Sequence, residues 1–254
     1  MYMTDAILQV KDLRKAYGAV KAVDGVSFEV KKGEIFGILG PNGAGKTTTL
    51  EMIETLRSID SGTATIAGID VAKNPYEIRA IIGVQPQTPG FQDKTKLTEL
   101  IQMFAACYGE HVNPKKFLDE VNLGSKADAY VENLSGGQRQ RFSIVAALVH
   151  SPKVFFLDEP TTGLDPQARR NLWDLVREVR DRGISVILTT HYMDEAEVLC
   201  DRVAIMDNGK IIGLDTPKKL IKQLLAKGFK KEQHVEQANL EDVFIDMTGK
   251  GLRA

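Results

Sequence analysis

Hydrophobic and polar positions along the chain follow two periods, and each period predicts one kind of element. Apolar and polar residues alternate along Ile7–Leu13 and Val26–Val30, which predicts strands with one buried face. Short apolar runs at Glu34–Leu39, Val154–Leu157 and Ile184–Leu188 predict strands that are buried on both faces. These segments are spread over most of the chain, and the longer stretches between them have a different spacing of apolar residues.

Helical spacing characterises the stretches between the strands. A stripe at i, i+3, i+4 and i+7 predicts an amphipathic helix that contains Leu172, Leu175, Val176 and Val179. Further helices are expected over Lys46–Leu56 and across residues 92–133, while Asp207-Asn208-Gly209 between apolar runs predicts a hairpin. Strands that alternate with helices predict an α/β core with a largely parallel sheet.

Composition and charge exclude several classes of protein. The 254 residues are 43% hydrophobic and 26% charged, as in globular proteins, and the formal net charge is −1. This balance gives no field that would attract nucleic acid, so we expect no nucleic-acid partner. Cys107 and Cys200 cannot form a disulfide framework, and their apolar neighbours predict buried packing residues. The N-terminus does not resemble a signal peptide, and the apolar runs are too short to cross a bilayer.

A glycine-rich loop after the first buried strand carries the clearest chemistry. Gly40-Pro41-Asn42-Gly43-Ala44-Gly45-Lys46-Thr47 matches G-x-x-x-x-G-K-[ST] at every fixed position. Glycines let the backbone turn tightly, so that successive N–H groups point at phosphate oxygens and the next helix directs its positive end toward them. Lys46 would add a charge near the β- and γ-phosphates, and the Thr47 hydroxyl would bind Mg²⁺. A chance match to a glycine-rich turn is disfavoured, because a strand precedes the loop and a helix follows it.

Two acidic residues follow the buried strand Val154–Leu157. A strand that ends in an aspartate is what proteins with such a loop use to hold Mg²⁺, which assigns that role to Asp158. Glu159 points elsewhere and suits a general base for an attacking water. The alternative is a strand end with two solvated acids, which the phosphate loop makes the weaker interpretation.

The segment Leu134-Ser135-Gly136-Gly137-Gln138 resembles the signature sequence of ATP-binding cassette (ABC) proteins. Tyr17 resembles the family's aromatic residue that stacks on adenine, and Gln87 resembles the glutamine that joins the core to the helical subdomain. Gly163-Leu164-Asp165 resembles the loop after the catalytic glutamate, and His191 resembles the histidine at the γ-phosphate. These motifs stand in the family's order from about Ile7 to Pro217.

The resemblance implies a fold, a domain organisation and a set of site residues. We expect a P-loop NTPase core with a mostly parallel sheet, an N-terminal antiparallel β portion and an inserted helical subdomain at about 88–150. The nucleotide-binding domain would span 1–217, followed by a helical extension at 218–254. Glu159, His191 and Gln87 would be catalytic, and Thr47, Gln87 and Asp158 would bind Mg²⁺. ATP would contact Tyr17, Asn42, Gly43, Ala44, Gly45, Lys46, Thr47, Thr48, Ser135, Gly137, Gln138 and Asp165.

The same resemblance implies partners. In the family, the signature of one copy covers the nucleotide on the loop of a second copy, so we expect an ATP-driven dimer, preferably a homodimer. One cassette without a membrane span resembles a transport subunit that drives a membrane-spanning permease on a separate chain. The chain would then be peripheral, on the cytoplasmic face of the cell membrane. Similarity to daunorubicin-resistance cassettes of the ABC-2 type rests on Thr48–Ile53, Gly213–Pro217 and Leu240–Ile245.

Several alternatives stay open. A non-transport ABC ATPase acting on a soluble assembly is the main rival, and a nucleotide sensor without hydrolysis is disfavoured by Glu159 and His191. The segment from Thr88 to about Tyr108 is expected to meet the permease, where Phe91 is either a partner contact or core packing. The lysine-rich stretch from Lys218 to Lys231 is either a membrane-facing surface or, preferably, a solvated helix face.

Overall fold

A computed structural model describes residues 6–88 and 90–229 of the chain. Its internal contacts divide the chain into two units, Met1–Leu220 and Ile221–Ala254. The boundary proposed after residue 217 would fall at the start of helix α8 (Pro217–Ala226), whereas the contacts divide the chain within that helix. Leu240–Ile245, Lys230 and Lys231 lie outside the described residues.

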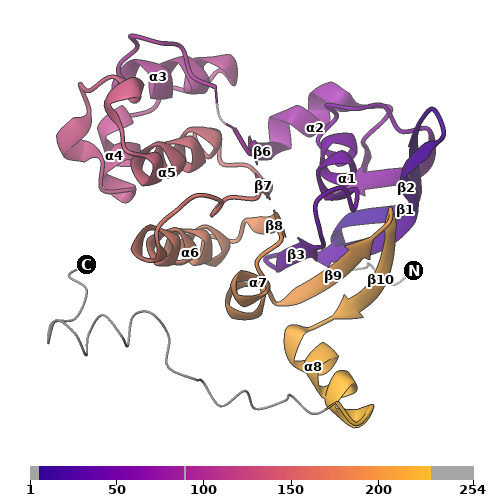
Figure 1. Cartoon of the computed structure of the whole chain (residues 1–254). Coiled ribbons are helices and arrows are strands. Elements are labelled where there is room, and N and C mark those ends of the chain that lie inside the picture. The colour runs from indigo at the N-terminus through magenta and orange to yellow at the C-terminus, as the bar shows by residue number, and fades with distance from the viewer. Residues whose placement is uncertain (1–5, 89, 230–254) are drawn as a thin grey trace, which may run out of the picture. The chain divides into compact units, whose positions relative to one another are not determined.

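The first unit contains two sheets (Figure 1). An antiparallel sheet has the strand order β2-β1-β4-β5. Its strands are β1 (Ala6–Tyr17), β2 (Val20–Lys31), β4 (Ser61–Ile66) and β5 (Ile69–Asp70). The alternating apolar positions of β1 and β2 face a core that they share with helix α1 (Lys46–Ile53), as period-2 patterning predicts.

The second sheet positions the chemistry, and its order is β10-β9-β3-β8-β7-β6. All neighbours are parallel except the hairpin of β9 and β10, which turns at Asn208-Gly209 as predicted. The strands are β3 (Ile35–Leu39), β6 (Ile82–Gln85), β7 (Val154–Asp158), β8 (Ser185–Thr190), β9 (Arg202–Asp207) and β10 (Lys210–Asp215). The α/β prediction with a mostly parallel sheet and an antiparallel β portion is confirmed.

Helices cover the parallel sheet, and residues of β3 and β7 alternate between two hydrophobic cores. Ile35 and Phe155 pack in the core shared with the helices, whereas Phe36 and Phe156 pack in the core shared with the first sheet. The other helices are α2 (Pro75–Ile81), α3 (Leu97–Cys107), α4 (Pro114–Glu120), α5 (Gly136–Ala147), α6 (Pro166–Asp181) and α7 (Met193–Leu199). We propose that α3, α4 and α5 constitute the helical subdomain at 88–150.

Three details differ from the sequence prediction. Helix α1 ends at Ile53 rather than Leu56, because Thr55 has φ 65° and a helix cannot continue through that conformation. The stretch from 92 to 133 is only partly helical, since short 3₁₀ turns replace an α-helix at Gly124–Lys126 and Val131–Asn133. Cys107, the last residue of α3, is exposed rather than buried, while Cys200 is buried as predicted.

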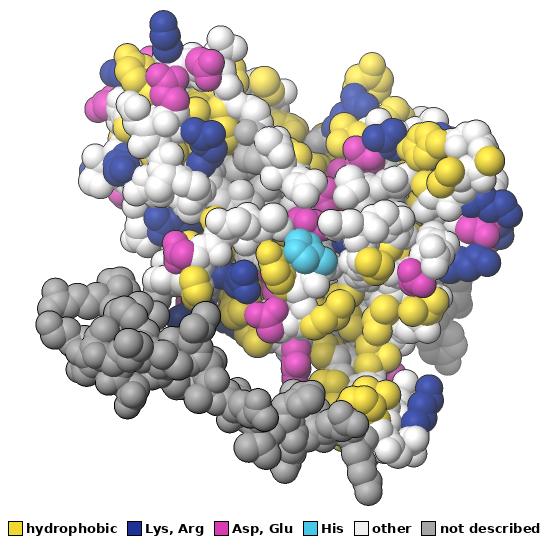
Figure 2. Space-filling model, viewed as in Figure 1, with side chains coloured by type: hydrophobic (Ala, Val, Ile, Leu, Met, Phe, Trp, Pro, Cys, Tyr) yellow, Lys and Arg dark blue, Asp and Glu magenta, His cyan; other side chains and the backbone are white. Residues whose placement is uncertain are grey.

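Two further features concern the charges on the surface and the hydrophobicity of the helices. Basic and acidic side chains are interspersed on the face shown in Figure 2, without a large area of one sign. Of the helices in the described part of the chain, none is both long and apolar enough to cross a bilayer.

Glu54 caps the C-terminal end of α1 and is buried, with 5% of the residue exposed. Its carboxyl has no hydrogen bond or ion pair with any residue that the structure describes. Burial raises the pKa of Glu54 to about 8, and the negative charges of Asp158 and Glu51 add to this effect. The folded chain therefore holds this proton over a pH range in which an unfolded chain releases it.

We expect the raised pKa of Glu54 to make the fold less stable as pH rises. The ordinary pKa of the side chain is 4.5, so its stabilising contribution is complete below pH 4.5 and is lost as pH rises toward 8. Glu54→Gln should remove up to about 1.4 kcal/mol per pH unit from the slope of the unfolding free energy in this window. Urea unfolding between pH 5 and 9 measures it, with Glu77→Gln, an exposed acid on α2, as the control. Parallel slopes for the wild type and Glu54→Gln would contradict the assignment.

Candidate functional site

The loop Gly40–Gly45 joins the end of β3 to the start of α1, and its glycines are required by close backbone contacts. A Cβ atom on Gly40 would lie 2.2 Å from the carbonyl oxygen of Met206. A Cβ atom on Gly45 would lie 2.2 Å from the carbonyl oxygen of Ala22, and Gly45 also has φ 99°. Larger residues would displace the loop from β9 and β2, so the path of the loop depends on these two positions.

Lys46 begins α1 and turns its side chain back over the loop. Its Nζ donates hydrogen bonds to the carbonyl oxygens of Gly40 (2.9 Å) and Pro41 (3.1 Å). The same Nζ lies 3.5 Å from Oε1 of Glu159, and both side chains are nearly excluded from solvent, at 4% and 8% exposure. A buried ammonium at the N-terminus of a helix, inside a loop of tight turns, makes a site for a polyanion.

A cleft of about 410 Å³ opens beside this lysine. It is lined by Tyr17, Ala22, Asn42, Gly43, Gly45, Lys46, Thr47, Thr48, Gln87 and Glu159. Seven of the twelve residues predicted to contact ATP therefore lie together, and the predicted catalytic residues Gln87 and Glu159 join them from two other segments. Tyr17 ends β1 and is 42% exposed, which leaves part of its ring open to a ligand.

Asp158 ends β7 next to the start of α1. Its carboxylate accepts a hydrogen bond from Oγ1 of Thr47, at 3.1 Å to Oδ2, and another from Oγ1 of Thr189 on β8. Burial raises the pKa of Asp158, while these two hydrogen bonds act in the opposite direction. A carboxylate beside a hydroxyl supplies the hard oxygen donors that Mg²⁺ prefers. Among the described residues, no group of three or more His, Cys, Asp or Glu side chains is placed to hold a metal ion by itself.

The backbone of Glu159 turns sharply at the end of β7. Its φ is 47°, a left-handed conformation that costs a glutamate about 1–2 kcal/mol. Its N–H donates to the Thr189 carbonyl oxygen (3.2 Å) and to Thr189 Oγ1 (3.0 Å), so strand β8 holds the turn in place. Because of this turn, Glu159 and Asp158 project in different directions.

The Glu159 carboxylate is the point where the predicted catalytic residues converge. Oε2 accepts hydrogen bonds from Nε2 of Gln87 and from Oγ1 of Thr162, both at 3.3 Å. Nδ1 of His191 also lies 3.3 Å from Oε2, although it is not aligned for a hydrogen bond. Lys46 faces the other oxygen, so a buried carboxylate is surrounded by donors and beside the cleft, as a general base requires.

Ser135 and its neighbours lie in a different place. They line a second cleft of about 530 Å³ together with Gly137, Gln138 and Asp165. Ser135 caps α5 reciprocally with Gln138, and Asp165 caps α6 through the N–H groups of the first turn. None of these four residues lines the cleft beside Lys46, so the predicted nucleotide residues fall into two separate groups.

Sequence reasoning missed two contributors to the site, Thr189 and Thr162. Thr189 holds both Asp158 and the Glu159 turn, and Thr162 donates to the Glu159 carboxylate. Thr189 ends an apolar run two residues before His191, and its pairing with Asp158 follows from the order of β7 and β8 in the sheet. A sequence pattern without that strand order does not reveal the contact.

Comparisons with known proteins identify one family and several similar structures. A family model described as ABC transporter matches residues 23–162. The Nod factor export ATP-binding protein I of Ralstonia nicotianae is 42% identical over 85% of this chain and 68% of its own length. The daunorubicin/doxorubicin resistance ATP-binding protein DrrA of Streptomyces peucetius is 38% identical over 92% of this chain and 72% of its own length. The crystal structure of an ATP-binding cassette of an ABC transporter in its ADP conformation superposes with a TM-score of 0.79, at 29% identity, over 88% of this chain and 96% of that chain.

We expect Glu159→Gln to separate binding from turnover. The amide keeps the size of the side chain and removes the base, so ATP should bind at least as tightly while turnover falls by about 10²-fold or more. Equilibrium binding of ATP and single-turnover phosphate release measure the two effects. Glu197→Gln, an exposed acid on α7, is the control and should leave both unchanged. Wild-type turnover in Glu159→Gln would show that another group is the base.

Proposed function

The chain belongs to the ABC transporter family of ATP-binding proteins, and from this premise we propose that it is the ATP-hydrolysing subunit of an exporter whose membrane-spanning part is a separate chain. The observation that carries this proposal is the convergence of Lys46, Gln87 and His191 on the carboxylate of Glu159, beside a phosphate loop. A nucleotide sensor without hydrolysis would have no use for a buried base in this position.

We assign the steps of hydrolysis to the residues that line the cleft. The loop N–H groups and Lys46 bind the phosphates, and Tyr17 stacks on the adenine. Thr47, Asp158 and Gln87 would hold Mg²⁺, which would neutralise charge on the phosphate oxygens. Glu159 accepts the proton of the attacking water, while Gln87 and His191 orient that water near the γ-phosphate. Phosphates that draw Lys46 toward themselves would weaken its pairing with Glu159 and leave the carboxylate free to act as a base.

The position of the signature residues supports a site shared between two chains. Ser135, Gly137, Gln138 and Asp165 line a cleft of their own, where the first turn of α5 offers N–H groups and the positive end of the helix. We propose that a second copy of the chain places these residues over the nucleotide on the loop of the first copy. By the two-fold symmetry of a homodimer, each chain would then complete the site of its partner.

The names of the relatives support a direction of transport. One relative is named for Nod factor export and another for daunorubicin/doxorubicin resistance. We propose that this chain likewise drives export and binds peripherally to the cytoplasmic face of the cell membrane through the permease. The main rival, an ABC ATPase of a soluble assembly, predicts that the chain purifies without a membrane-spanning partner.

The contact with the permease is proposed at the segment that follows Gln87. Phe91 lies 5.1 Å from Phe142 and 6.3 Å from Phe104, measured between ring centroids, which favours the packing role over the contact role for this residue. A groove beside Phe91 offers more exposed side chains, including Leu56 and Tyr108.

Two inactive variants should complement each other if each site is shared. Ser135→Arg disrupts the signature and Glu159→Gln removes the base. A mixed dimer keeps one intact site, which combines the base of one chain with the signature of the other. An equal mixture should recover about a quarter of wild-type activity, because half of the dimers are mixed and each has one of two sites intact. A mixture of Lys46→Ala with Glu159→Gln is the control. Both substitutions affect the half of the site that contains the phosphate loop and the base, so a mixed dimer has no intact site. Phosphate release decides between the outcomes, and an inactive first mixture would contradict a shared site.

The transport proposal has its own test. The tagged chain is purified from membranes of cells that express its neighbouring genes, and the membrane-spanning chain that accompanies it is identified and reconstituted in lipid nanodiscs. We expect ATP hydrolysis by this chain to change when the reconstituted membrane subunit is added. A chain that associates with no membrane-spanning subunit, or whose ATPase rate ignores it, would favour the rival.

A further inference from the structure

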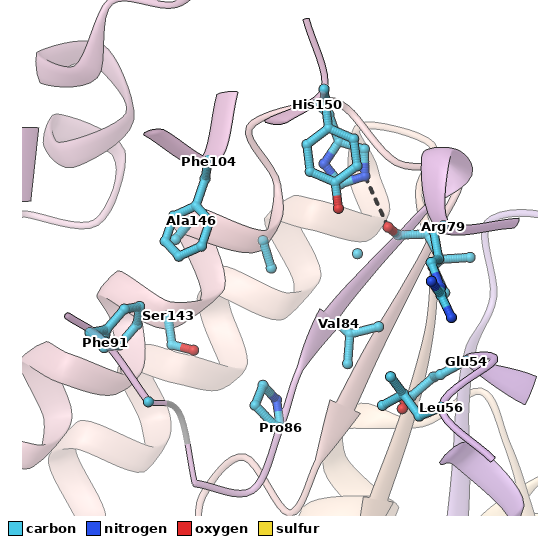
Figure 3. A pocket seen from close by; sticks show the side chains of 15 residues that line it. Glu54, Leu56, Arg79, Val84, Pro86, Phe91, Phe104, Ser143, Ala146 and His150 are labelled. Atoms are coloured by element: carbon cyan, nitrogen blue, oxygen red, sulfur yellow. Dashed lines mark hydrogen bonds between the residues drawn. The ribbon is translucent and has the colours of Figure 1, made fainter. Parts of the chain in front are cut away.

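Glu195 on helix α7 is a buried acid that takes no part in the steps of hydrolysis assigned above. Its side chain is fully enclosed by protein, with 0% of the residue exposed, whereas the buried Glu54 borders an open groove beside Phe91 (Figure 3). Helices α6 and α7 pack on strand β8 in one hydrophobic core (Figure 1). An apolar side chain of similar size would fill this position at a lower cost in free energy, so packing alone does not explain an acid here.

One hydrogen bond joins the Glu195 carboxyl to helix α6. Oε1 accepts from Nε1 of Trp173 at 3.0 Å. Oε2 is excluded from solvent, as is Oγ1 of Thr161, and neither is aligned for a hydrogen bond with any residue that the structure describes. Burial raises the pKa of Glu195, and four neighbouring groups oppose this effect: the hydroxyl of Thr190, the indole of Trp173, the hydroxyl of Thr161 and the guanidinium of Arg169. The carboxyl is therefore surrounded by groups from α6, from the end of β8 and from the turn after β7.

The end of β8 presents one threonine to the cleft and the next to this carboxyl. Successive side chains of a strand point to opposite faces, so Thr189 points toward Asp158 and Thr190 points toward helices α6 and α7. Oγ1 of Thr190 also accepts a hydrogen bond from the N–H of Tyr192, at 3.0 Å. Because Thr190 and Tyr192 flank His191, their positions determine where the histidine lies.

The turn after β7 shows the same division. Thr162 donates to the Glu159 carboxylate, whereas Thr161, which is fully buried, faces Glu195. The segments that carry Glu159 and His191 therefore meet in two places. They meet at the Glu159 carboxylate inside the cleft and at the Glu195 carboxyl behind it.

A second contact holds helix α6 to the loop that carries His191. The guanidinium carbon of Arg169 lies 4.5 Å from the centroid of the Tyr192 ring, and its Nη1 lies 3.5 Å from Oδ2 of Asp194. His191 packs against the same tyrosine, with 4.1 Å between the ring centroids. The histidine, its loop and the start of α6 are thus packed as one group, which Glu195 contacts from α7.

We propose that Glu195 is a positioning residue for ATP hydrolysis, which holds these two segments together behind the cleft and so sets the distance between Glu159 and His191. This inference rests on the proposed function, because it takes the two residues to act on the attacking water. Nδ1 of His191 lies 3.3 Å from Oε2 of Glu159. A change of about 1 Å in such a separation is enough to slow a reaction by up to about 10²-fold, because both groups must reach one water. Glu195 does not line the cleft beside Lys46, so it acts through its neighbours.

The test measures ATP affinity and single-turnover hydrolysis by the full chain. Glu195→Met keeps the approximate size of the side chain and removes its polar contacts, so hydrolysis should fall by about tenfold or more while ATP affinity stays within about twofold. The matched control, Leu199→Val, loosens the packing of the same helix without removing a polar contact and should hydrolyse ATP as the wild type does. Wild-type hydrolysis by Glu195→Met would overturn the inference.

A double-mutant cycle separates positioning from general stabilisation of the fold. If Glu195 acts through His191, Glu195→Met should add less than about twofold to the loss that His191→Ala already causes. If Glu195→Met causes its full loss in the His191→Ala background as well, the glutamate does not act through the histidine and the inference is overturned.

The outcomes separate the two proposals. If the wild-type chain does not hydrolyse ATP, or if Glu159→Gln hydrolyses it at the wild-type rate, the proposed function fails and this inference falls with it. If the wild type hydrolyses ATP and Glu159→Gln does not, a wild-type rate for Glu195→Met overturns only the inference.

A second variant leaves Glu195 in place, in case its substitution prevents folding. Trp173→Phe removes the N–H group that binds Oε1 of Glu195 and keeps an aromatic ring on α6. Hydrolysis should fall by about threefold, the effect of one hydrogen bond of ordinary strength, and this loss should disappear in the His191→Ala background. Unchanged hydrolysis by Trp173→Phe, or an equal loss in both backgrounds, would overturn the inference.

Discussion

The ion pair between Lys46 and Glu159 is the interaction on which the nucleotide cleft depends. Its two charges lie 3.5 Å apart and almost out of contact with water, so their attraction is screened far less than that of a surface pair. Neither charge is satisfied by the pair alone, because Lys46 also holds two loop carbonyls and Glu159 also accepts from Gln87 and Thr162. In the proposed mechanism, phosphates would compete for the lysine, and the carboxylate that they release is already surrounded by groups that would orient a water. The same contact would then preserve the loop without nucleotide and leave the base available for hydrolysis.

The order of the parallel sheet makes this pair possible. The loop follows β3, Gln87 follows β6, Asp158 ends β7 with Glu159 directly after it, and His191 follows β8. Because these strands are parallel neighbours in the order β3-β8-β7-β6, their carboxyl ends meet at one edge. Thr189 then fixes the direction of each acid, since it binds the Asp158 carboxylate with its hydroxyl and supports the left-handed turn at Glu159 with its backbone. The strain at Glu159 is therefore sustained by the neighbouring strand and places two adjacent carboxylates in two different environments.

Sequence patterns predicted the parts of this arrangement that are local. The loop glycines and the strand that ends at Asp158 each depend on a few adjacent residues, and each was predicted from them. The role of Thr189 could not be, because it depends on which strands are neighbours. The burial predicted for Cys107 was wrong, because apolar neighbours in the sequence do not show whether another element covers the last residue of α3. The early end of α1 at Ile53 had no signal either, since a threonine with positive φ is not favoured by its own chemistry. Glu54 is similar: its lack of a counter-charge is a property of the surrounding elements and not of the segment that contains it.

The separation of the two clefts has a consequence for how ATP could do work. If one chain supplied the complete site, nucleotide would bind and leave without a large movement of chains or domains, because all the residues of the site would already be in place. Here the signature group lies away from the loop, so in the proposed dimer the binding energy of its contacts would become available only when a second chain approaches. Hydrolysis would remove the phosphate that both groups share, and the favoured arrangement would then revert. Helix α1 contributes Thr47 to the cleft at one end and ends beside the buried Glu54 at the other, so movements at the nucleotide would reach the far end of the helix through eight residues.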